Sequence, residues 1–92
     1  MLVYVSIGNS DDKLTQADWA GFAARVRNEI RGVATAVYGE WYSAPDSGYQ
    51  NMCICFETTV TSAPYLKSNL AEARAEFRQD SLAWAVAETE FL

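Results

Sequence analysis

Hydrophobic and polar residues alternate along several short stretches of this chain, as they do in strands that bury one side. The first stretch covers residues 2–7, where every second position is a branched aliphatic residue: Val3, Val5 and Ile7. It runs into the polar segment 8–12, whose glycine, asparagine, serine and two aspartates are typical of a loop. We therefore expect a first strand that buries one side.

The middle of the chain predicts a hairpin between Gly32 and Thr59, with the turn Pro45-Asp46-Ser47-Gly48. Proline presets the first turn angle, Asp and Ser hydrogen-bond to their own backbone, and glycine tolerates the left-handed conformation that reverses the chain. The two flanking strands are expected at residues 33–43 and 52–56.

Two parts of the pattern leave alternatives open. Gly39 can mark a bulge that shifts the phase of the second strand, so either Trp41 or Tyr42 points inward. Residues 81–92 alternate bulky residues with alanine, although alanine also favours extension of the preceding helix. We interpret this segment as a fourth strand because its bulky residues alternate so regularly, at Leu82, Trp84 and Val86.

A first helix is predicted to begin at Thr15. Thr15 can cap it, Asp18 completes a capping box, and Leu14 can pack onto Trp19. Gly32 is expected to end it as a left-handed cap. Its apolar stripe consists of Trp19, Phe22, Ala23, Val26 and Ile30.

A second helix is predicted after Thr61-Ser62-Ala63, with Pro64 in its first turn. Its apolar stripe follows the helical spacing i, i+4, i+7 and i+11 and consists of Leu66, Leu70, Ala73 and Phe77.

The resulting order, strand, helix, strand, strand, helix, strand, predicts an α+β fold. We expect the ferredoxin-like βαββαβ sandwich, a four-stranded antiparallel sheet with two helices on one face. The 92 residues, half of them hydrophobic, suit a single domain over residues 1–92. The strand residues expected to face the helices are Val3, Val5, Ile7, Val37, Met52, Ile54, Phe56, Leu82, Trp84 and Val86.

Charge and hydropathy argue against two classes of partner. Seven Lys and Arg against twelve Asp and Glu give a net charge of −5, which opposes binding to nucleic-acid backbones and suits a basic partner. The sequence contains no apolar run of the roughly 18 residues that a membrane span needs, and no basic leader precedes the first strand. We expect a soluble, cytoplasmic protein that binds neither nucleic acid nor membrane.

The sequence contains two cysteines and no histidine. Cys53 and Cys55 are two positions apart in an extended run, a poor geometry for a disulfide, so we expect free thiols. Their stretch has no neighbouring cation to activate a thiol, and small buried apolar groups are a better interpretation than a redox or metal pair. Without histidine, a Cys/His zinc site and Ser-His or Cys-His catalysis are not expected, and no metal or cofactor is predicted.

The functional hypothesis rests on the sheet face that the helices leave open. That face is predicted to be apolar and almost free of charge, whereas a solvated sheet face usually carries Lys, Glu and Thr. We expect it to bind a second copy of the chain, as a homodimer, or a host protein. The predicted interface residues are Tyr4, Ala34, Ala36, Tyr38, Asn51, Cys53, Cys55, Ala83, Ala85 and Ala87.

Several alternatives follow from the same residues. Arg25 and Arg31, with Arg27 between them, can bind an anion or the carboxylates of a partner. A small acidic chain of this kind can serve as an inhibitor or adaptor encoded by a phage or mobile element, by analogy of size and class. It can also sequester a small molecule or nucleotide between the subunits of an oligomer.

Two resemblances to known families extend these alternatives. Residues 3–7 resemble the opening strand of an RNA-recognition motif, in which the Tyr4 position stacks on a base, but Asn51 and Cys53 stand where that family has aromatic and basic residues. The topology also resembles that of dimeric α/β-barrel enzymes, which implies a cofactor-free enzyme with Glu57 for acid/base chemistry. Its aromatic pocket would consist of Tyr4, Tyr38, Trp41, Asn51 and Trp84.

Overall fold

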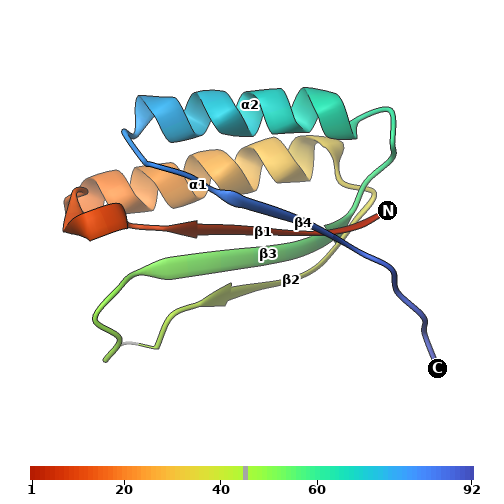
Figure 1. Cartoon of the computed structure of the whole chain (residues 1–92), viewed down its shortest axis with the longest axis horizontal. Coiled ribbons are helices and arrows are strands. Elements are labelled where there is room, and N and C mark those ends of the chain that lie inside the picture. Colours follow the sequence, from red (N-terminus) through yellow and green to blue (C-terminus); the bar gives the residue numbers. More distant parts are fainter. Residues whose placement is uncertain (45) are drawn as a thin grey trace.

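The computed structural model describes residues 1–44 and 46–92. The elements follow the predicted order (Figure 1), which confirms the α+β class. Their bounds are β1 Leu2–Gly8, α1 Gln16–Val33, β2 Ala36–Tyr42, β3 Asn51–Glu57, α2 Ala63–Glu76 and β4 Ala83–Ala87, with a short 3-10 helix, η1, at Ser10–Asp12.

The four strands form one antiparallel sheet in the order β2-β3-β1-β4. Both helices pack on the same face of this sheet (Figure 1), as predicted. We call the opposite face the open face. The strands β2 and β4 are its two edges, and β1 and β3 lie between them.

The start of α1 is confirmed and its predicted end is wrong. The Thr15 hydroxyl accepts a hydrogen bond from the backbone N–H of Asp18 at 3.2 Å, which caps the helix. At the other end, α1 continues through Gly32 to Val33, and Gly32 does not adopt a positive φ. The helical hydrogen bonds continue past Gly32, as the N–H of Ala34 donates to the carbonyl of Ile30 at 2.8 Å.

The core lies between the sheet and the two helices, and both predicted helical stripes face it. Phe22 of α1 stacks on Phe77, just beyond α2, with ring centroids 5.2 Å apart. One strand residue departs from the prediction: Val86 is 55% exposed because β4 is an edge strand that pairs with β1 alone.

The register of β2 against β3 shifts between Val37 and Gly39, so Tyr38 is the extra residue of a bulge. The shift decides the alternative that the sequence left open. Trp41 lies on the open face, whereas Tyr42 lies on the helix side, where its hydroxyl accepts a hydrogen bond from Arg27.

The two remaining connections differ in part from the pattern. The predicted turn includes Pro45, which lies outside the described residues. Gly48 lacks the predicted left-handed conformation, because the tight hydrogen bond of this connection lies before it, from the N–H of Ser47 to the carbonyl of Ala44 at 2.9 Å. In the last segment, Ala83–Ala87 is a strand rather than a helix extension, but residues 81–82 and 88–92 lie outside it. Leu82 still packs against the core from the connection before β4.

Candidate functional site

Most of the predicted interface residues share the open face. Cross-strand pairing places Tyr4 beside Cys55 and Ala85, and Trp41 beside Cys53. The predicted residues at open-face positions of the regular register are Tyr4, Ala36, Asn51, Cys53, Cys55, Ala83, Ala85 and Ala87. Ala34 is not among them, because it caps α1 and packs against the core cluster.

Aromatic side chains surround Cys55 on the open face. Cys55 is only 4% exposed, although no helix covers this side. A hydrogen bond with the Cys55 thiol is the main cause that raises the pKa of Tyr4. The pKa of Tyr38 is raised mainly by desolvation and, to a smaller extent, by the Glu57 carboxylate. The Tyr38 hydroxyl donates a hydrogen bond to Glu57 Oε1 at 3.4 Å. Both thiols are free, so their predicted state is confirmed.

The open face is almost without charge. Among the strand positions that face this side, only Glu57 is charged, and it lies at the end of β3. The remaining positions are aromatic, aliphatic, small or uncharged polar residues. Such a surface loses little electrostatic solvation when another molecule covers it.

The chain that follows β4 crosses part of the open face. The ring of Phe91 lies 6.5 Å from the ring of Tyr38, although β4 and β2 are opposite edges of the sheet. Figure 1 shows this terminal segment leaving β4 toward the side away from the helices. It therefore reaches the end of the face that contains Tyr38 and Glu57.

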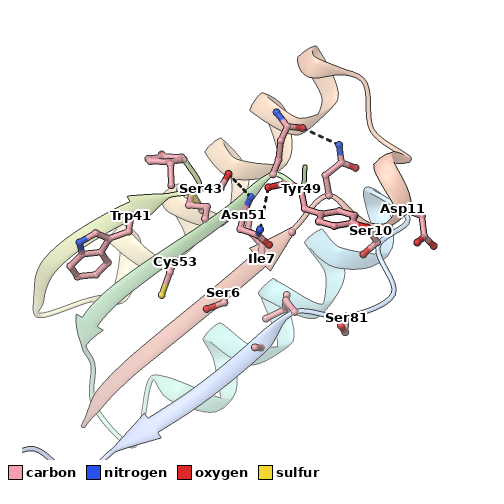
Figure 2. A pocket seen from close by; sticks show the side chains of 17 residues that line it. Ser6, Ile7, Ser10, Asp11, Trp41, Ser43, Tyr49, Asn51, Cys53 and Ser81 are labelled. Atoms are coloured by element: carbon pink, nitrogen blue, oxygen red, sulfur yellow. Dashed lines mark hydrogen bonds between the residues drawn. The ribbon is translucent and has the colours of Figure 1, made fainter. Parts of the chain in front are cut away.

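The other end of the open face is hollowed into a cavity of about 650 Å³ (Figure 2). Ser6, Cys53 and Ala83 line it from the sheet. Its rim comes from three connections, through residues 8–11, through residues 43 and 49–50, and through residues 81–82. The rim and wall side chains include Ser10, Asp11, Trp41, Ser43, Tyr49, Asn51 and Ser81.

Two buried amides hold these connections together. Asn9 is 3% exposed; its Nδ2 donates to the Leu14 carbonyl at 3.0 Å and to Gln50 Oε1 at 3.1 Å, while its Oδ1 accepts from the Leu14 N–H at 2.9 Å. Gln79 is 2% exposed and its Oε1 accepts from the Ser10 N–H at 2.9 Å. Because buried polar groups must be satisfied, these bonds fix the rim.

The predicted anion-binding arginines have partners within the chain. Arg25 Nε donates to Glu29 at 3.1 Å, and Arg31 Nη2 to Glu40 at 2.8 Å. Burial alone would raise the pKa of Glu40, but hydrogen bonds from Arg31 and Arg27 outweigh it and hold the pKa below its usual value. Binding of an external anion by Arg25 or Arg31 stays a prediction and would have to compete with these pairs.

The residues of the predicted enzyme pocket are not all brought together. Trp84 lies on the helix side, where its ring contacts Phe56 at a centroid distance of 6.1 Å, while Tyr4 and Trp41 lie on the open face. Within residues 1–44 and 46–92, there is no group of three or more His, Cys, Asp or Glu side chains that could hold a metal ion. No helix in this part of the chain is long and apolar enough to cross a membrane.

Comparison with known proteins finds no family model that matches the chain and no curated protein that matches its sequence. Sequence reasoning missed Asn9 and Gln79, because a loop amide that becomes buried has no distinguishing pattern. It left open whether Trp41 or Tyr42 points toward the helices, because the bulge shifts the alternation of β2.

Proposed function

We propose that the protein is a non-enzymatic interaction module that forms a homodimer through its open face. The observation that carries the proposal is the distribution of side-chain size across this face. Tyr38 and Trp41 lie on the β2 side and are each about half exposed, and we call them the aromatic edge. Ala83 and Ala85 lie exposed on the β4 side, and we call them the alanine edge.

This distribution is self-complementary. A two-fold axis parallel to the strands, between two facing sheets, brings the β2 side of one copy over the β4 side of the other. The aromatic edge of each copy then covers the alanine edge of its partner, and large side chains fill the space above small ones. Aligned packing of two twisted sheets, at about 30°, accommodates this arrangement.

Charge favours a second copy over a basic partner. The chain has a net charge of −5, but of the open-face strand positions only Glu57 is acidic. A surface built to recognise a basic protein would place carboxylates where the partner docks. The nearly neutral strand positions let two acidic copies approach with little repulsion, and the carboxylates of this side lie at its margin, in Glu57 and in the terminal segment with Glu88 and Glu90.

We also infer that the architecture is the ferredoxin-like sandwich. The element order, the antiparallel strand order β2-β3-β1-β4 and the packing of both helices on one face support this assignment. In a sandwich of this kind, the sheet face that the helices leave open contacts either solvent or a partner. The apolar side chains of the open face favour a partner.

Sedimentation velocity at micromolar concentrations tests the homodimer. We expect the wild-type chain to sediment as a dimer and Ala85→Arg as a monomer, because the new cation would be buried against the aromatic edge. Ala75→Arg, at an exposed position of α2, is the matched control and should stay dimeric. A monomeric wild-type chain over the whole concentration range would contradict the proposal.

A further inference from the structure

We propose that the cavity at the end of the open face binds an uncharged, planar, hydrogen-bonding heteroaromatic molecule of about nucleoside size. The cavity volume of about 650 Å³ is that of a small-molecule site, typically about 300–1,000 Å³. The site is formed by one chain alone. Because Trp41 and Ala83 line the cavity and also belong to the two edges of the open face, a second copy on that face would compete with the ligand.

Aromatic side chains provide the surfaces for a planar ligand. Figure 2 shows Trp41 and Tyr49 on either side of Asn51, from β2 and from the connection before β3. Both rings are more than half exposed, so each offers a surface for stacking; the Trp41 indole lies over Gly39 and offers the side turned away from it. Asn51 lies between them and carries an amide that matches the edge of a heterocycle.

Polar groups in the cavity have unused hydrogen-bonding capacity. Asn51 Nδ2 donates to the Tyr49 carbonyl at 3.3 Å, which leaves its second hydrogen and its Oδ1 for a ligand. The hydroxyls of Ser6 and Ser81 also line the cavity, and neither bonds to another residue in the described part of the chain. Such groups fix the orientation of a ligand.

The charge of the lining selects an uncharged ligand. The described residues that line the cavity include one charged side chain, Asp11, and neither Lys nor Arg. A phosphate group would find no cation here and would meet the Asp11 carboxylate. The site therefore fits the base and sugar of a nucleoside rather than a nucleotide.

The rim is organised before any ligand arrives. The buried amides of Asn9 and Gln79 join the three connections that surround the cavity, through bonds of 2.9–3.1 Å. A rim held in this way needs little ordering on binding, which favours affinity for a small ligand.

Calorimetric titration with adenosine, guanosine, cytidine and uridine tests the inference. Quenching of tryptophan fluorescence that is lost in Trp41→Phe is a second readout, because the chain also contains Trp19 and Trp84. We expect at least one nucleoside to bind, and Asn51→Ala to weaken that binding by about 10-fold or more, the loss typical of an unmade buried hydrogen bond. The matching nucleoside monophosphate should bind more weakly, and Asp11→Asn should narrow this difference.

The homodimer and the ligand site can fail separately. Ala85 does not line the cavity, so the Ala85→Arg variant should bind the nucleoside whether or not the wild-type chain is a dimer. No heat and no quenching with any of the four nucleosides at millimolar concentration, in the Ala85→Arg variant whose cavity no second copy covers, would overturn the inference. Binding that Asn51→Ala leaves unchanged, or that Ala85→Arg abolishes, would also overturn it.

Discussion

The indole of Trp41 occupies the space that a side chain at Gly39 would need. A Cβ built on Gly39 would lie 2.8 Å from Cη2 of Trp41, too close for any real contact. The glycine thus determines where the exposed indole lies on the open face. The aromatic edge and the wall of the cavity both depend on this position.

The substitution Gly39→Ala is therefore expected to move the indole and leave the fold intact. The atoms that clash belong to the far end of an exposed side chain, so we expect the free energy of unfolding to change by only about 0.5 kcal/mol. Self-association should weaken by about 10-fold or more, because the large groups at the centre of an interface dominate its energy. Urea unfolding and sedimentation separate the two effects; unchanged sedimentation would contradict the role of Trp41.

Gly32 gives the opposite test. It lies in the last turn of α1 with a helical conformation, and a Cβ there would meet no atom within 4 Å. Gly32→Ala should therefore stabilise the protein by about 0.5–1 kcal/mol, since alanine loses less backbone entropy in a helix. A thermal melt measures this gain, and a loss of stability would mean that Gly32 is left-handed after all.

The difference between Gly32 and Thr15 explains how far the sequence predicts the fold. Thr15 caps α1 through contacts with residues within three positions, and such local signals can be read from the chain. Whether a helix ends at a glycine or continues through it depends on tertiary packing. The pattern of hydrophobic and polar residues does not contain that information. The same reason explains Val86, whose exposure follows from the edge position of β4.

The candidate site divides in the same way. The apolar character of the open face follows from alternation, which places Tyr4, Cys53 and Ala85 on one side whatever the loops do. The cavity does not follow from it, because the cavity requires three connections to meet at one end of the sheet. Their meeting depends on Asn9 and Gln79, which contact residues that are distant in sequence.

The cysteines should differ in reactivity. Cys55 is buried and its thiol is hydrogen-bonded with Tyr4, whereas Cys53 is partly exposed beside Trp41. We expect iodoacetamide to label Cys53 about 10-fold faster or more, since access to the thiolate controls the rate. Mass spectrometry of Cys53→Ala and Cys55→Ala gives the two rates separately. Faster labelling of Cys55 would contradict the packing described for the open face.

Loss of the Asn9 amide should destabilise the protein more than loss of an exposed one. Asn9→Ala leaves the buried N–H and carbonyl of Leu14 without their partner, and we expect a cost of about 1–3 kcal/mol. Gln16→Ala is the matched control. Within the described residues the exposed Gln16 amide bonds with that of Gln50 alone, so its loss should change stability by about 0.5 kcal/mol or less. Chemical unfolding measures the free energy of unfolding of both variants. Equal losses would show that the Asn9 amide does not hold the rim together.

The ion pairs of Glu40 should make stability depend on pH. Arg27 Nε lies 3.0 Å and Arg31 Nη2 lies 2.8 Å from the carboxylate, and hydrogen bonds from both hold its pKa below the usual value. A lowered folded-state pKa means that the pairs contribute fully above the unfolded-state pKa of about 4.3, and that the contribution is lost as the pH falls through the folded-state value.

Glu40→Gln should therefore lower the free energy of unfolding by about 1 kcal/mol at pH 7, a modest value because the arginines are partly exposed. The difference from the wild type should shrink below about pH 4, where the wild-type carboxyl begins to protonate. Urea unfolding from pH 3 to pH 7 measures both. Glu72→Gln is the control, at an exposed position of α2 without an ion pair in the described chain, and its free energy of unfolding should follow that of the wild type at every pH. If Glu40→Gln is still less stable than the wild type at pH 3, the substitution has removed packing rather than charge.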